Sequence, residues 1–118
     1  MEDFLFVFRM EIANDEVQPS PEQRLASMKS WQEWLGAIAA KNKLVTAGSR
    51  LKSDGKVVKP KSMVTDGPYI EMKEAIGGYS IIKAASLAEA AELAEGCPIF
   101  LIGGNVEVRQ IIPMDDNS

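Results

Sequence analysis

The sequence predicts an α+β fold assembled from two strand–helix–strand halves. Three observations support this prediction. Two segments carry apolar residues at helical spacing behind clear helix-start signals, and apolar or alternating segments typical of strands flank each of them. Between the two halves lies a short polar stretch rich in turn residues, which predicts an inserted hairpin.

The first half begins with an apolar run at residues 4–10 that is interrupted only by Arg9, as expected of a strand buried on both faces. Ser20 at the N-cap, Pro21 at N1 and Gln23 at N3 form a capping box and predict a helix that ends near Lys41. Its apolar stripe comprises Leu25, Met28, Trp31, Trp34, Leu35 and Ile38. Residues 43–51 are the second predicted strand.

The inserted stretch contains Asp54-Gly55, a strong signal for a type I′ turn. We therefore expect residues 49–52 and 56–59 to pair as a hairpin whose pairing ends at Pro60. Residues 62–65 are compatible with one further short strand.

The second half opens with a strand at residues 77–84, where Gly77-Gly78 favours a β-bulge. Ser86 and Glu89 form another capping box, and Gly96 is at the C′ position of the helix that follows. Residues 105–111 alternate and predict the last strand. The whole chain, residues 1–118, thus reads as one ferredoxin-like βαββαβ domain with an extra hairpin, and residues 113–118 are expected to form a flexible tail.

This topology predicts a homodimer. Right-handed crossovers place both helices on one face of the sheet, yet the first and third main strands are apolar on both faces. We assign one face to Leu5, Val7, Ile82 and Ala84, and the other to Phe4, Phe6, Phe8 and Ile81. Because nothing else in the chain can cover the helix-free face, a second copy is expected to do so, which gives a dimeric α/β barrel.

Composition excludes several classes of function. The net charge of −4 argues against direct binding to nucleic acid or to an anionic membrane. Without histidine, His-ligated metals and Ser-His-Asp or Cys-His sites are impossible, and the lone cysteine, Cys97, is expected to be buried and structural. We expect neither a metal nor a cofactor.

The sequence shows no signal peptide and no membrane-spanning apolar run, so a cytoplasmic protein is expected. One local exception to the acidic balance is a group of cations that forms either a solvated charged ribbon or an edge that attracts anions: Arg50, Lys52, Lys56, Lys59 and Lys61.

The stretch VTDGPYIEMKEAIGGY at residues 64–79, followed by GCP at 96–98 and GGNVEVRQI at 103–111, resembles the YCII-related proteins, in particular their DGPF-domain branch. Tyr69 replaces the phenylalanine usual in that motif. The resemblance covers nearly the whole chain and implies a ferredoxin-like fold that dimerises into a barrel. Some YCII-like members carry a His–Asp pair proposed as an active site, and some relatives are linked to sigma-factor-like transcription proteins. This chain lacks the histidine, so only Asp66 matches that pair.

The 66–78 loop combines a rigid Asp-Gly-Pro turn with charged residues and paired glycines, either as a turn alone or as the border of a pocket. In the second case Asp66 is the candidate proton-handling group. The candidate contacts for a small anionic organic molecule are Arg9, Tyr69, Lys73 and Arg109.

The alternative function is a non-catalytic module that acts with a transcription or signalling partner. A closed cavity that contains charges would favour the small-molecule site, whereas a large apolar surface outside the dimer contact would favour the binding module.

Overall fold

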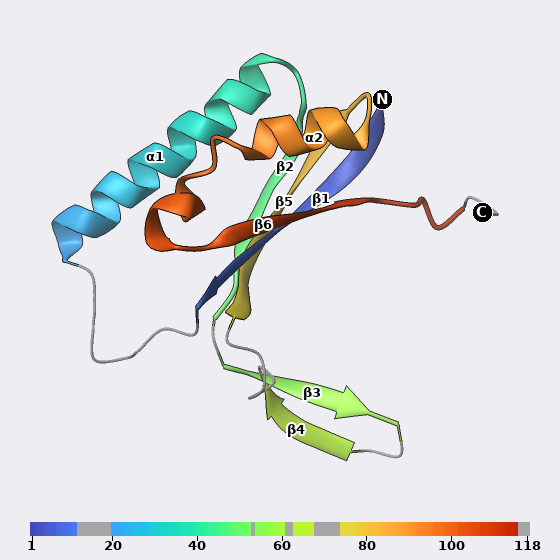
Figure 1. The fold of residues 1–118 in the computed structure, drawn as a ribbon. Helices are drawn as coiled ribbons and strands as arrows, with labels where there is room; N and C mark the ends of the chain where they lie inside the picture. Colours follow the sequence, from blue (N-terminus) through green and yellow to red (C-terminus); the bar gives the residue numbers. More distant parts are fainter. Residues whose placement is uncertain (12–19, 53, 61–62, 68–73, 116–118) are drawn as a thin grey trace.

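A computed structural model describes residues 1–11, 20–52, 54–60, 63–67 and 74–115. The elements are, in order, β1 (Glu2–Glu11), α1 (Pro21–Ala40), β2 (Leu44–Arg50), β3 (Gly55–Lys59), β4 (Met63–Gly67), β5 (Glu74–Ala84), α2 (Leu87–Ala94), the 3₁₀ helix η1 (Pro98–Ile102) and β6 (Asn105–Gln110). An antiparallel four-stranded sheet has the strand order β2-β5-β1-β6, and both α-helices pack on one of its faces (Figure 1). The predicted α+β fold of ferredoxin-like topology is therefore confirmed.

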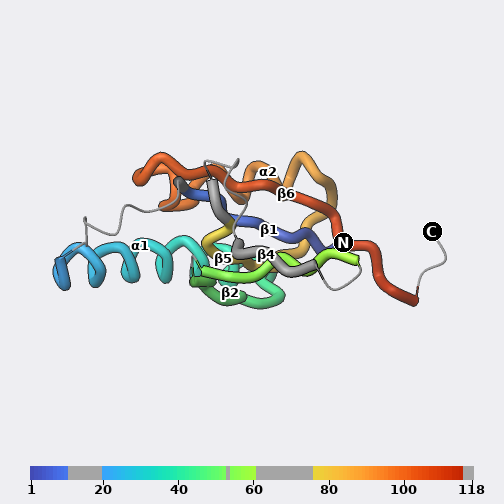
Figure 2. The backbone as a smooth tube through the Cα atoms, turned by 90° about the horizontal axis from the view of Figure 1, so that it is seen from below, coloured from blue at the N-terminus to red at the C-terminus, as the bar shows by residue number. Residues whose placement is uncertain are grey.

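Local capping explains where α1 begins. The Ser20 hydroxyl accepts a hydrogen bond from the Gln23 N–H, and the Gln23 side chain accepts one from the Ser20 N–H, which completes the predicted capping box. A 20-residue helix is about 30 Å long, and the first half of α1 projects beyond the sheet (Figure 2). Leu25 and Met28, which we expected on the core-facing stripe, are consequently 67% and 53% exposed.

The start of α2 follows the prediction only in part. The Ser86 hydroxyl accepts a hydrogen bond from the Glu89 N–H at 3.1 Å, as expected of an N-cap. The Glu89 carboxylate, however, accepts from the N–H of Ala85 at 3.4 Å and from Lys43 Nζ at 2.6 Å. This side chain therefore ties the N-terminus of α2 to the segment between α1 and β2.

The core lies between the helices and the sheet. Trp34 stacks on Phe6 and meets Phe8 edge-on, and its indole N–H donates to the Leu93 carbonyl at 3.0 Å. Such aromatic pairs add to the stabilisation from apolar burial, and the hydrogen bond satisfies the indole N–H. The buried cluster consists of Phe4, Phe6, Phe8, Trp34, Ile38, Ile82, Ala84, Ala90, Ala94, Cys97 and Ile99.

The register between β1 and β5 corrects the faces assigned from sequence. Ile82 pairs with Phe4 and Ile81 with Leu5. Because cross-strand partners share a face, Ile82 and Ala84 belong to the helix-covered core, and Ile81 is on the helix-free face beside Leu5. The assignment was reversed because a continuously apolar strand gives no period from which its phase can be read.

The predicted bulge in β5 is confirmed. Phe8 pairs with Gly78 and Arg9 pairs with Ile76, so that Gly77 is the extra residue. A Cβ at Gly77 would approach the Met10 side chain to 2.8 Å, and one at Gly78 would come within 2.8 Å of the Ser49 carbonyl oxygen. Gly78 is therefore required by the close approach of β5 to the backbone of β2, whereas at Gly77 the flexible end of the Met10 side chain can move aside.

The inserted hairpin exists, but the predicted turn within it is wrong. β3 pairs with β4, from Gly55 opposite Gly67 to Lys59 opposite Met63, and forms a separate two-stranded sheet beyond one end of the main sheet (Figure 1). Neither Asp54 nor Gly55 is among the described residues with positive φ, which both central residues of a type I′ turn require. Asp54-Gly55 thus belongs to the connection from β2 to β3.

Candidate functional site

The 66–78 loop lies only in part within the residues that the structure describes, which include 66–67 at the end of β4 and 74–78 at the start of β5. Tyr69 and Lys73 lie outside the described residues. Asp66 is in β4, where its backbone pairs opposite Lys56, and its side chain is also outside what the structure describes. The proposed pocket beside Asp66 therefore stays a prediction.

The two predicted arginines meet on the helix-free face of the main sheet through Glu107. Arg9 in β1 donates from Nε and an Nη to Glu107 Oε1 at 3.3 and 3.1 Å. Arg109 in β6 donates from Nη to Glu107 Oε2 at 3.4 Å. The pairing of β1 with β6 sets Glu107 opposite Val7 and Arg109 opposite Leu5, so the three charged side chains share one face.

The cluster carries a net positive charge, because two guanidinium groups share one carboxylate. Hydrogen bonds from Arg109 and Arg9 hold the pKa of Glu107 below its ordinary value, so this carboxylate is charged near neutral pH. The Arg9 side chain is 22% exposed and that of Arg109 is 72% exposed. Arg9 is therefore held in place by Glu107, whereas Arg109 reaches outward.

Beside these charges the same face is apolar. Leu5, Tyr79 and Ile81 are half-buried there, and Val7 is 9% exposed between its cross-strand neighbours Tyr79 and Glu107. Sequence reasoning did not identify Tyr79 as a neighbour of this site. With Ile81 assigned to the face of Phe4, the alternation of side chains along a strand places Tyr79 on that face too, away from Arg9, so only the register of β5 against β1 brings it to the site.

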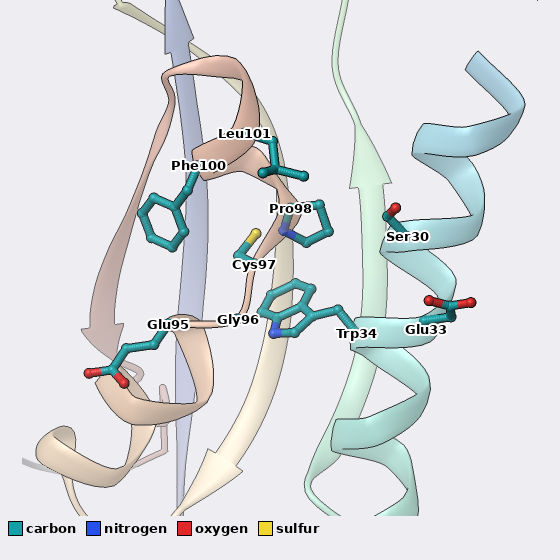
Figure 3. Close-up of a pocket in the computed structure, with 9 residues that line it drawn as sticks. All are labelled: Ser30, Glu33, Trp34, Glu95, Gly96, Cys97, Pro98, Phe100 and Leu101. Carbon is teal, nitrogen blue, oxygen red and sulfur yellow. The ribbon is translucent and has the colours of Figure 1, made fainter. Parts of the chain in front are cut away.

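A second surface feature lies on the opposite side of the sheet, where α1 faces the segment that connects α2 to β6. It is an open groove of about 530 Å³, and its lining residues are Ser30, Glu33, Trp34, Glu95, Gly96, Cys97, Pro98, Phe100 and Leu101 (Figure 3). Phe100 and Leu101 are 49% and 84% exposed. Of the residues proposed from sequence, the two that the structure describes with their side chains, Arg9 and Arg109, are not among the lining residues of this groove.

Cys97 forms part of the groove wall, but the residue is only 3% exposed. Burial raises the pKa of this thiol to about 11, against a weaker opposing effect of a backbone hydrogen bond. A protonated, covered thiol is a poor nucleophile, which agrees with the structural role expected for Cys97.

Within the described ranges, no three side chains of the Asp, Glu, Cys and His types gather as they would around a metal ion. No α-helix in the same ranges has the length and apolar character needed to cross a membrane.

Two comparisons with known proteins bear on this geometry. The family model of the YCII-related domain matches residues 5–115, which is nearly the whole chain. A search of curated proteins found no match.

Proposed function

Since the chain belongs to the YCII-related domain family, we propose that it is a homodimer that binds a small anionic organic molecule on the helix-free face of its sheet. The observation that carries this proposal is the Arg9–Glu107–Arg109 cluster, which borders an apolar strip on that face. A guanidinium group recognises carboxylate and phosphate groups through paired N–H donors.

The two arginines differ in how firmly Glu107 holds them, and this difference supports the proposal of an anionic ligand. Glu107 fixes the Arg9 guanidinium and leaves Arg109 with a single contact of 3.4 Å among the described residues. Arg109 therefore retains most of its five N–H donors for a ligand. The apolar body of that ligand would lie against Leu5, Val7 and Tyr79.

A second copy would supply what this site lacks in one chain. The helix-free face is covered by neither helix, and Leu5 and Ile81 are only half-buried there. Packing of two such faces would exclude water from the arginine cluster and strengthen its attraction for an anion. The expected assembly is the dimeric α/β barrel that the resemblance to YCII-related proteins implies.

Catalysis is the more specific form of this proposal. Asp66 would be the group that accepts or donates a proton, and Tyr69 and Lys73 would contact the ligand from the same loop. In the absence of any histidine, acid–base work near neutral pH would fall to Asp, Glu, Lys, Tyr or the lone Cys with a shifted pKa, and Asp66 is the candidate among them.

The test is a binding screen of small carboxylates and phosphate esters by thermal shift, followed by calorimetry on any hit. We expect Arg109→Gln to weaken a genuine hit by roughly tenfold or more, as the loss of a charged hydrogen bond implies. Arg24→Gln on the exposed surface of α1 removes the same charge at a distance and should have no such effect. Equal affinity in the Arg109 variant and the wild type would contradict the proposed site.

The alternative function is a non-catalytic module that acts with a protein partner. One observation favours it, namely the exposed apolar residues of η1, where Phe100, Leu101 and Ile102 follow one another at 49%, 84% and 64% exposure.

A further inference from the structure

The groove between α1 and η1 is apolar along its floor and acidic at both sides. Trp34 and Pro98 form the floor, and Leu101 rises beside them (Figure 3). Glu33, from α1, and Glu95, from the end of α2, lie on opposite sides of Trp34 (Figure 3). An occupant of this groove would therefore meet one apolar surface between two carboxylates.

Nothing in the described part of the chain neutralises these carboxylates. Glu33 and Glu95 make no ion pair or side-chain hydrogen bond there, and Lys29, one turn before Glu33, forms no ion pair with it. Glu95 is the C-cap of α2, whose last turn has no basic residue. Because the C-terminal end of a helix carries partial negative charge, the electrostatic potential on this side of the groove favours a cation.

The same chain presents a surface of the complementary pattern. At the end of β2, the segment Arg50-Leu51-Lys52 has a cation on each side of an apolar residue, and all three residues are exposed. The N–H of Leu51 donates to the Gly77 carbonyl at 2.9 Å, which fixes the backbone of this segment against β5. Ile76, the neighbour of Gly77 in β5, adds a second apolar side chain at 44% exposure.

We propose that the 50–52 segment of one copy docks in the α1–η1 groove of a second copy. Leu51 would lie against Trp34 and Leu101, with Arg50 and Lys52 directed to Glu33 and Glu95. In one chain the segment lies at the end of the sheet from which the β3–β4 hairpin extends, whereas the groove lies beside α1 (Figure 1). The contact therefore joins different copies.

This contact is heterologous, because different patches of the two copies meet. A heterologous contact continues from copy to copy and yields a ring or an open chain. The groove lies on the side of the sheet that carries the helices, and the 50–52 segment lies at the end of β2. The contact can therefore add to the sheet-face dimer proposed above and does not depend on it. The surface is small and its charges are exposed, so the association is weak and sensitive to salt.

The first experiment measures self-association by analytical ultracentrifugation in low and high salt. For the wild type we expect the average mass to rise with protein concentration in low salt and to fall back in high salt. Two double variants reverse one side each, namely Glu33→Lys with Glu95→Lys, and Arg50→Glu with Lys52→Glu. Each variant alone should lose the concentration-dependent growth, because its two surfaces now carry like charge.

The decisive sample is an equimolar mixture of the two variants. In that mixture each reversed surface has a complementary partner on the other variant, so the growth in mass should return. Arg24→Glu with Lys41→Glu is the matched control, since it makes the same change in charge at exposed positions of α1 and its C-cap. That control should keep the concentration-dependent growth of the wild type, because its groove and its 50–52 segment are both unchanged.

A second measurement locates the contact. A Leu51→Cys chain mixed with a Leu101→Cys chain should form a disulfide between copies under mild oxidation, whereas Val45→Cys mixed with Leu101→Cys should not. Val45 is a suitable control because it is 48% exposed, close to the 49% of Leu51. Absence of concentration-dependent growth in the wild type, or failure of the mixed variants to recover it, overturns the proposal. So does equal cross-linking of Leu51→Cys and Val45→Cys to the Leu101→Cys chain.

Discussion

Gly48, in β2, has a backbone conformation that other amino acids cannot adopt without strain. Its φ is +75°, and a Cβ there would overlap the carbonyl oxygen of Tyr79 in the neighbouring strand. Two hydrogen bonds hold the surrounding bulge, since the Ser80 hydroxyl donates to the Ala47 carbonyl at 2.7 Å and the Gly48 N–H donates to Thr46 Oγ1 at 3.1 Å. These hydrogen bonds stabilise the positive φ at Gly48.

We therefore expect Gly48→Ala to lower the free energy of unfolding by at least about 2 kcal/mol, since positive φ and steric overlap act together. Chemical denaturation measures the change. Gly36→Ala is the matched control, because no atom lies within 4 Å of a Cβ built there and the site is inside α1. That substitution should raise stability by roughly 0.5–1 kcal/mol through helix propensity. Similar losses in both variants would exclude a special role for Gly48.

The buried thiol of Cys97 gives a pH-dependent prediction. Burial raises its folded pKa from 9.0 to about 11, so the folded state retains a proton that the unfolded state loses. Its contribution to stability is fully present below pH 9 and is lost as the pH rises towards 11. The difference in unfolding free energy between the wild type and Cys97→Ala should therefore be constant up to about pH 9 and then shrink. A difference that stays constant to pH 11 would show that the thiol is accessible in the folded state.

The candidate site shows at residue scale what sequence can and cannot provide. Arg9 attracted notice as the only charge in an apolar strand, and Arg109 as a charge on the last strand. Their common partner, Glu107, is 98 residues from Arg9, and only the register of β1 against β6 brings the two together. Tyr79 was missed for the same reason, because the phase of β5 depends on tertiary packing and not on its own pattern.

At the scale of elements, local chemistry determined the helices well and the strand pairing less well. Ser20 with Gln23, and Ser86 with the Glu89 N–H, begin helices where the sequence predicts. Asp54-Gly55 has the composition of a hairpin turn, yet β3 pairs with β4 and not with β2. Turn residues such as Asp-Gly indicate which backbone conformations are locally favourable. Strand pairing depends instead on the cross-strand contacts made along the whole length of the two strands.

The N-terminus of α2 offers a test of this local control. Ser86→Ala removes the acceptor for the Glu89 N–H and should cost about 1 kcal/mol of stability by denaturant unfolding. Ser27→Ala on an exposed turn of α1 is the control and should change stability by less than about 0.5 kcal/mol. Equal effects at the two serines would argue against the cap.

Glu89 adds a dependence on pH to the same element. The hydrogen bond from Lys43, together with that from the Ala85 N–H, lowers the pKa of Glu89 below 4.5. The stabilisation from this ionised carboxylate is present above pH 4.5 and is lost as the pH falls through the lowered pKa. Glu89→Gln should therefore destabilise the protein at neutral pH. The stability of this variant should also fall less steeply than that of the wild type as the pH is lowered. An unchanged acid transition would contradict the assignment.

At the scale of the whole molecule, the uneven covering of the sheet is the feature that remains to be explained. One face carries α1, α2 and the buried aromatic cluster, while the other presents half-buried Leu5 and Ile81 beside the Arg9–Glu107–Arg109 cluster. Apolar surface of this kind is stabilised when a second sheet covers it. The corrected phase of β5 now identifies Ile81, and not Ile82, as the residue that tests this interpretation.

We predict that the wild type sediments with about twice the chain mass of 12.9 kDa at micromolar concentration, and that Ile81→Asp shifts it towards the monomer. The aspartate would place an unpaired charge in a desolvated contact, which is costly, while in an isolated chain it would remain partly hydrated. Val7→Asp is a poorer probe, because Val7 is 9% exposed in one chain and its replacement would also disturb folding. Val58→Asp, at a position 73% exposed on β3, is the control and should leave the dimer intact. If the wild type is a monomer, or if Ile81→Asp remains fully dimeric, the sheet face is not the contact, and the arginine cluster on it must act in a site that is open to solvent.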